Sequence, residues 1–176
     1  MAIRRRKIQA VVQDLLATHK VTEAPVPVER IAKAQGARIF YKALEDDLSG
    51  FIYRENQQSV IGVNTHHAPV RQAFTIAHEL GHLLLHDQDH EQLHVDRVHD
   101  FSIRLRSGVS SEGTDESEME ANLFAAELLM PSAFLARDLK NRQLLDDRGV
   151  ITLAKKYGVS TQALLIRLSS LGHIRQ

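Results

Sequence analysis

Two histidines and a glutamate have the spacing needed to hold a metal ion and to activate water. His78, Glu79 and His82 form the pattern H-E-x-x-H within RQAFTIAHELGHLLLH, residues 71–86. Apolar residues recur through this stretch at helical spacing, which predicts an amphipathic helix. Residues four apart on a helix lie one above the other, so both imidazoles can bind one zinc ion while the glutamate reaches a water on that ion. The pattern indicates the chemistry of a zinc peptidase.

The motif is short, and a chain with 10 histidines could contain it by chance. The alternative is an ordinary helix with two surface histidines. Gly81 argues for the metal site, because a glycine inside a helix costs about 1 kcal/mol relative to alanine. Its presence indicates that another segment approaches the helix closely at this point. A second helix that carries carboxylates and alanines follows in the sequence and is the natural neighbour.

A catalytic zinc ion usually keeps three protein ligands and one open position. We expect the third ligand on the second helix, residues 116–129, where Glu116, Glu118 and Glu120 are the candidates. Acidic residues in a first helical turn also complement the helix dipole, so the residue types leave all three open. His86 lies eight helical residues beyond the first motif histidine, about 12 Å away, which is too far to share the ion. It is expected to act at the C-terminus of the motif helix.

The chain before the motif predicts two helices, over residues 3–19 and 28–36, followed by strands. The strand-like segments are residues 37–42, 48–54, 59–64 and, after the motif helix, 101–106. Short polar turns between the first three predict an antiparallel sheet that leads directly into the motif helix. The polar stretch after the motif helix, up to residue 100, is expected to be a loop.

These elements predict an α+β fold: a small antiparallel sheet of three to four strands, packed on the helices that carry the motif. The C-terminal sequence predicts two short helices around the turn Gly158–Ser160, an arrangement similar to a helix-turn-helix. We therefore expect a metallopeptidase domain over residues 1–146. Residues 147–176 are expected to form a helical tail packed on the same domain.

The composition excludes several classes of protein. Acidic and basic residues balance at 22 each, so no net charge favours nucleic acid or an anionic membrane. The chain has no cysteine, which leaves histidine and carboxylate as the strong metal ligands. No stretch approaches 18 apolar residues, and the N-terminus has no signal-peptide core. A soluble cytoplasmic protein without membrane partners is expected.

Two blocks, RQAFTIAHELGHLLLH and ESEMEANLFAAELLMP, resemble the ImmA/IrrE metallopeptidases, and the similarity covers most of residues 20–172. These are soluble bacterial and phage-related proteases that are often paired with a helix-turn-helix repressor. The resemblance implies that His78, His82 and Glu120 hold the metal and that Glu79 is catalytic. The expected ion is Zn²⁺, with Mn²⁺ as the alternative, because two histidines and a carboxylate suit several divalent ions.

The resemblance also implies the substrate, a partner repressor that is cut within its chain so that repression is relieved. The chain departs from the family pattern at two positions. Ala73 stands where relatives commonly carry arginine, and Arg167 stands where an apolar core residue is usual.

The competing hypothesis is a regulator without enzymatic activity, stabilised by a metal, that binds a repressor or DNA through its C-terminal helices. Its contacts would be Lys155, Lys156, Arg167 and Arg175. The neutral charge and the lack of a dense basic stripe weaken this hypothesis, so direct DNA binding is not expected to be the primary role. Glu79 also argues against a purely structural metal, because a structural site is closed and needs no base.

The remaining parts of a peptidase site are less defined by the sequence. The motif histidines need acceptors for their second ring nitrogens, and Asn122 is one candidate. The substrate is expected to lie extended along an exposed edge of the sheet. The candidates for stabilising the transition-state oxyanion are Tyr53, Arg71, His94 and His99.

Overall fold

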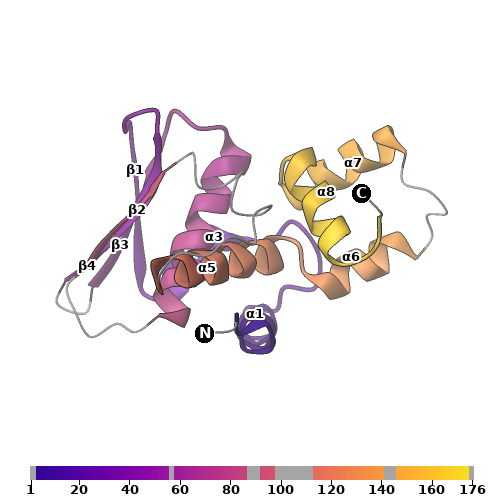
Figure 1. The fold of residues 1–176 in the computed structure, drawn as a ribbon, viewed down its shortest axis with the longest axis horizontal. Helices are drawn as coiled ribbons and strands as arrows, with labels where there is room; N and C mark the ends of the chain where they lie inside the picture. The colour runs from indigo at the N-terminus through magenta and orange to yellow at the C-terminus, as the bar shows by residue number, and fades with distance from the viewer. Residues whose placement is uncertain (1–2, 56–57, 87–91, 98–112, 141–145, 175–176) are drawn as a thin grey trace.

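The computed structural model describes residues 3–55, 58–86, 92–97, 113–140 and 146–174 (Figure 1). The elements in chain order are α1 (Arg5–Thr18), α2 (Val28–Ala34), β1 (Ala37–Lys42), β2 (Leu48–Glu55), β3 (Gln58–Asn64), α3 (Pro69–Leu85), β4 (Gln92–Arg97), α5 (Gly113–Leu129), α6 (Ser132–Leu139), α7 (Asp147–Tyr157) and α8 (Thr161–Ser170). The expected α+β class is confirmed, and the motif lies on α3 as predicted. The strand expected at 101–106 lies outside the described residues.

The four strands form one mixed sheet in the order β1-β3-β2-β4. β2 is antiparallel to both β3 and β4, but β1 is parallel to β3, where the sequence analysis expected antiparallel pairing throughout. The reason is that β2 and β3 pair as a hairpin, whereas the connection between β1 and β2, residues 43–47, crosses β3 and leaves a place for it between them. β1 therefore lies on the far edge of β3 rather than next to its neighbour in sequence.

β4 replaces part of a segment that was expected to be a loop. Residues 92–97 pair with β2 at the second edge of the sheet, with Val95 opposite Phe51. The signal in QLHVDR is weak because its alternation is short and flanked by polar residues. Pairing with β2 stabilises it as a strand, which is a non-local effect.

The helices cover one face of the sheet, which is seen nearly edge-on in Figure 1. Ile52 and Ile61 of the sheet are buried in a single core with Ile76 and Leu80 of α3. The strand β2 and the helix α3 approach very closely at Gly50, where a Cβ atom would lie 2.4 Å from Cγ2 of Thr75. This contact requires glycine and fixes how α3 crosses the sheet.

The second close approach joins α3 and α5, which lie side by side in Figure 1. A Cβ atom on Gly81 would lie 3.1 Å from Cα of Ala121 and 3.1 Å from Cδ1 of Phe124. The expectation that another segment packs tightly against Gly81 is therefore confirmed. The two helices that carry the candidate ligands are in direct backbone contact.

The C-terminal helices α7 and α8 form as expected around Gly158, whose φ of 65° is the left-handed conformation that glycine adopts readily. Arg167 of α8 is buried and paired with the carboxylate of Glu127 on α5, and its Nε donates to the carbonyl of Met130 at 3.2 Å. The tail is thus anchored to the same helix that carries the acidic ligand candidates.

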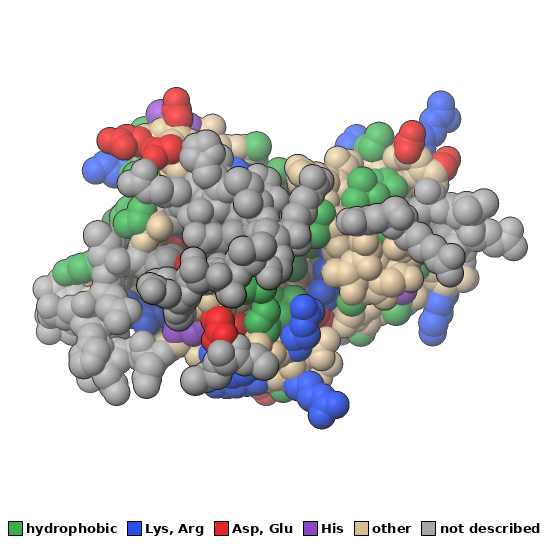
Figure 2. Space-filling view, in the orientation of Figure 1, with side chains coloured by type: hydrophobic (Ala, Val, Ile, Leu, Met, Phe, Trp, Pro, Cys, Tyr) green, Lys and Arg blue, Asp and Glu red, His purple; other side chains and the backbone are tan. Residues whose placement is uncertain are grey.

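Two findings bear on the competing hypothesis of DNA binding. Buried Arg167 is not available to a phosphate, and Lys156 pairs with Asp138 at 2.8 Å, while Arg175 lies outside the described residues. Figure 2 shows the basic side chains of one face spread over several places rather than gathered in a stripe.

Within the part of the chain that the structure describes, none of the helices combines the length and the apolar character that crossing a membrane requires.

Candidate metal centre

The side chains of His78 and His82 converge in the buried interface between α3 and α5. Their Nε2 atoms lie 3.1 Å apart, and both residues are almost fully buried. Glu118 of α5 completes the cluster: its Oε1 lies 3.1 Å from Nε2 of His82 and its Oε2 lies 3.5 Å from Nε2 of His78. The three groups offer ligand atoms that lie within 4.8 Å of one another. Such a set could hold a divalent ion.

The hydrogen bond between His78 and Asn122 indicates which ring nitrogen of this histidine is available to a metal ion. Oδ1 of Asn122 lies 3.1 Å from Nδ1 of His78 and accepts the proton on that nitrogen. The lone pair of His78 is then on Nε2, which is the atom that faces His82 and Glu118. The expected contact of Asn122 with a motif histidine is present, and the tautomer that it selects fits a metal ligand.

The structure brings Glu118, not Glu120, to the histidines. The two carboxylates are equally buried, at 6% and 5% exposed, so burial does not separate them. Residues two apart on a helix point about 200° apart, and only one of the two can face α3. Glu116 of the same turn is half-buried and is not part of the cluster. The geometry therefore favours Glu118 over Glu120, which the family resemblance implied, as the third ligand candidate.

Glu120 instead binds Arg4, at the start of α1. Its Oε1 accepts the backbone N–H of Arg4 at 2.8 Å, and its carboxylate also accepts Nε–H and Nη2–H bonds from the guanidinium group. These hydrogen bonds hold the pKa of Glu120 below its usual range. Nη2 of Arg4 also donates to the carbonyl of Leu85 at the end of α3, at 3.2 Å. Arg4 thus links the C-terminal end of α3 to the middle of α5, the two helices that form the cluster.

A pattern in the sequence does distinguish Glu118 once the approach of α5 to Gly81 is known. Glu118 and Asn122 are four residues apart and share a face with Ala121 and Ala125, both fully buried. The small residues mark the side of α5 that contacts α3. The acidic residue on that side is the ligand candidate.

Glu79 is fully buried beside the cluster. It lies on the side of α3 that faces β2, where its carboxylate is near enough to Arg54 to favour the charged guanidinium. Burial has the larger effect and lowers the pKa of Arg54. The residue expected to be catalytic is therefore positioned next to the histidines and has a cation as a neighbour.

His86 is the C-cap residue of α3, at the expected position. Its Nε2 lies 3.1 Å from the carbonyl oxygen of Ser117, and its Nδ1 lies 4.0 Å from Oε2 of Glu120. Burial lowers its pKa, with the nearby carboxylate of Glu120 acting in the opposite direction. His86 therefore lies at the C-terminus of α3, as expected, and contacts α5 there.

Of the four candidates for oxyanion stabilisation, only Tyr53 and Arg71 have side chains among the described residues, and neither belongs to the cluster. Tyr53 is 37% exposed and lies on the opposite side of β2 from buried Ile52. Arg71 donates to Oγ of Ser49 at 2.7 Å, at the beginning of β2. The side chains of His94 and His99 lie outside the described residues.

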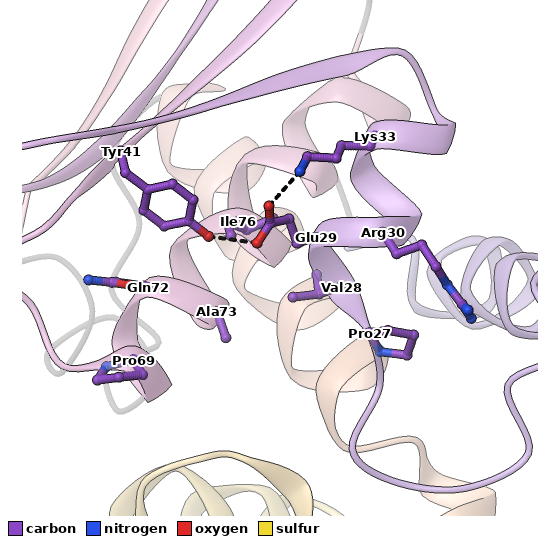
Figure 3. Close-up of a pocket in the computed structure, with 10 residues that line it drawn as sticks. All are labelled: Pro27, Val28, Glu29, Arg30, Lys33, Tyr41, Pro69, Gln72, Ala73 and Ile76. Carbon is purple, nitrogen blue, oxygen red and sulfur yellow. Dashed lines mark hydrogen bonds and ion pairs between the residues drawn. The ribbon is translucent and has the colours of Figure 1, made fainter.

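A separate cavity of about 670 Å³ lies between α2, β1 and α3 (Figure 3). Ala73 and Ile76 line it from α3, on another side of the helix than the motif histidines. The carboxylate of Glu29 accepts hydrogen bonds from Lys33 and Tyr41, both at 2.7 Å. Burial and this hydrogen bond raise the pKa of Tyr41 to about 12. Because neither motif histidine nor Glu118 lines this cavity, it is distinct from the candidate metal centre.

The fold and this buried cluster are those of a peptidase-type domain. A sequence model of the IrrE N-terminal-like domain, peptidase family M78, matches residues 32–169. The chain therefore belongs to this family, as the resemblance in the sequence predicted.

Two further comparisons agree with this assignment, one in sequence and one in fold. The chain is 28% identical over 144 residues to a protein of Bacillus phage phi105 described as uncharacterized immunity region protein 2, covering 82% of this chain and 81% of that protein. It also resembles the structure of a Mycobacterium tuberculosis transcriptional regulator, with a TM-score of 0.64 and 19% identity. That match covers 93% of this chain but only 46% of the regulator, so it bears on the fold alone.

Proposed function

We propose that this protein is a metal-dependent endopeptidase in which His78, His82 and Glu118 hold the ion and Glu79 acts as the general base. The observation that carries the proposal is the buried cluster of two imidazoles and a carboxylate with a further buried carboxylate beside it. A site that only stabilises the fold needs no such fourth group. Zn²⁺ is the proposed ion and Mn²⁺ the alternative.

The chemistry follows from the positions of these residues. A divalent ion bound there supplies a water of lowered pKa and polarises the scissile carbonyl. Glu79 takes a proton from the attacking water and delivers it to the nitrogen of the leaving amine. Asn122 holds His78 in the tautomer that keeps Nε2 free for the ion.

We further propose that the substrate is a helix-turn-helix repressor, which the enzyme cuts to relieve repression. The family resemblance supports this, as does similarity to a phage protein named for an immunity region. The substrate chain would lie extended along β4, the sheet edge beside β2, and add a strand to it.

The test of this function is cleavage of a repressor encoded next to the gene of this chain. Wild-type protein loaded with zinc is expected to cleave it, and a chelator is expected to stop the reaction. Glu79→Gln should retain the zinc but lower the rate by about 10²–10⁴-fold, because the water loses its base.

The matched control is Glu45→Gln, the same substitution at an exposed position, which should leave cleavage unchanged. Elemental analysis of each variant gives the zinc content, and gel electrophoresis gives the rate. Normal cleavage by Glu79→Gln would remove this residue from the mechanism.

A further inference from the structure

We propose that Arg54 is the residue that binds the carbonyl oxygen of the scissile peptide as negative charge develops on it. The proposal rests on the peptidase function proposed above and names a catalytic group within that site. The sequence gives no motif around Arg54, whereas its neighbour Tyr53 is one of the candidates for this role that the sequence offers.

The alternation of β2 places Arg54 on the inner face of the sheet. Gly50, Ile52 and Arg54 are two residues apart, so their side chains share one face of the strand. Ile52 on this face is buried in the core, and Gly50 is the point at which β2 meets α3. Arg54 therefore extends from the covered face of the sheet, whereas Tyr53 extends from the opposite face.

The contact between β2 and α3 brings this face to Glu79. Gly50 meets Thr75 of α3, and Glu79 is four residues beyond Thr75, on the same side of the helix. Arg54 is four residues beyond Gly50, on the same side of the strand. Both side chains thus lie in the interface between β2 and α3, where the carboxylate of Glu79 interacts with the guanidinium group.

The Nε–H of Arg54 is a donor that has no partner among the described residues. The structure buries its Nε atom and places no hydrogen-bond partner for it among the described residues. A buried donor without a partner is costly, and a catalytic role is one explanation for keeping such a group. A guanidinium group offers several donors in a fixed plane, which suits an oxygen that becomes negatively charged.

The role of Arg54 in the reaction involves no proton transfer. The attacking water forms a bond to the carbonyl carbon, and the π electrons of the carbonyl move to its oxygen. Arg54 remains protonated and donates an N–H bond to this oxygen more strongly as the charge grows. The proton of the water goes to Glu79 and then to the amine nitrogen as the C–N bond breaks.

The experiment uses the full chain loaded with Co²⁺, whose visible spectrum reports the ligand set. Inorganic phosphate is the probe, because it presents negatively charged oxygens in a tetrahedral arrangement. Arg54→Gln should weaken phosphate binding about tenfold or more, since a charge-assisted hydrogen bond is lost. The cobalt spectrum without phosphate and the affinity for 2-mercaptoethanol, which needs no cationic partner, should be unchanged.

The matched control is Arg38→Gln on β1, an exposed arginine of the same sheet, which should bind phosphate as the wild type does. In cleavage of the repressor, Arg54→Gln should lower kcat by about 10²–10³-fold with little change in KM. Added guanidinium ion should restore part of the rate of Arg54→Ala, whereas it would not restore a fold defect.

The outcomes separate this inference from the function on which it rests. Wild-type protein that takes up no cobalt would overturn both. Normal cobalt binding with phosphate affinity unchanged in Arg54→Gln would overturn the role of Arg54 and leave the metal site in place. If Arg54→Gln does not fold, Arg54→Lys takes its place, and an unchanged phosphate affinity and kcat in that variant would overturn the role of the guanidinium group.

Discussion

At the scale of single residues, the proposed metal centre depends on which atoms of each side chain are already engaged. His78 has two ring nitrogens, and the hydrogen bond of Nδ1 to Asn122 leaves Nε2 for the ion. Glu120 is engaged by Arg4, and Glu118 is the carboxylate that remains at the histidines. The centre is therefore defined by its surrounding hydrogen bonds as much as by its ligands.

Asn122 provides a test of this arrangement. Asn122→Ala should lower the affinity for zinc by about 10–100-fold, because His78 loses the acceptor that selects its tautomer. Asn122→Asp keeps an oxygen at the same place and should retain most of the affinity. Competition with a chromophoric chelator measures both values. Equal affinity of the alanine variant and the wild type would contradict the role of this hydrogen bond.

At the scale of elements, the centre requires that α3 and α5 lie in backbone contact. Gly81 makes the contact possible, since a Cβ atom added at this position would lie 3.1 Å from Cα of Ala121 and 3.1 Å from Cδ1 of Phe124. Arg4 joins the same two helices at the end of α3 through Leu85 and Glu120. The ligands from the two helices converge because both contacts fix the helix pair.

Gly81→Leu should separate these helices. The larger side chain has no space against α5, and overpacking of this kind costs about 1–3 kcal/mol of the free energy of unfolding. We expect a lower midpoint of urea unfolding together with weaker zinc binding. Val70→Leu, a comparable change at a largely exposed position of α3, is the control and should alter neither value. Zinc affinity that survives the loss of stability would contradict the link between helix contact and ligand geometry.

At the scale of the whole molecule, the C-terminal helices are joined to the metal centre through α5. The carboxylate of Glu127 pairs with Arg167 of α8 and also accepts the N–H of Ser132 at the start of α6. Arg167 is one of the two positions at which the resemblance led us to expect a different residue, and its charge is paired in the buried interior with Glu127. We propose that residues 147–176 are a tail of the peptidase domain.

Removal of one partner of this pair tests the attachment. Arg167→Met should lower the free energy of unfolding by about 3–5 kcal/mol, because the charge of Glu127 remains buried without its partner. The double variant Arg167→Met/Glu127→Gln should recover part of this loss, since glutamine removes the charge and keeps an acceptor for Ser132. Chemical denaturation measures both. A single variant as stable as the wild type would show that the pair does not hold the tail.

The sequence predicts the local elements of this molecule well, because their signals are local. The helical spacing around His78, the proline that follows Met130 and the glycine at position 158 each mark an element that the structure contains. The sequence does not predict features that depend on how distant segments meet. The parallel pairing of β1 and the strand at residues 92–97 are of this kind.

The same distinction applies to the metal centre. His78, Glu79 and His82 share one helix, so their spacing alone predicts that they lie together. The choice between Glu118 and Glu120 depends on which side of α5 faces α3, and this is set by the contact of Gly81 with Ala121. Arg54 comes from a strand whose crossing with α3 is visible only in three dimensions.

The most direct measurement of the central claim is the zinc content of two neighbouring variants, Glu118→Gln and Glu120→Gln, after saturation with zinc and removal of the excess. We predict that the Glu120 variant retains zinc at the level of the wild type. The Glu118 variant should lose most of it, because of these two carboxylates it is Glu118 that reaches the nitrogen atoms of His78 and His82. Full zinc content in the Glu118 variant, with loss in the Glu120 variant, would contradict the proposed centre.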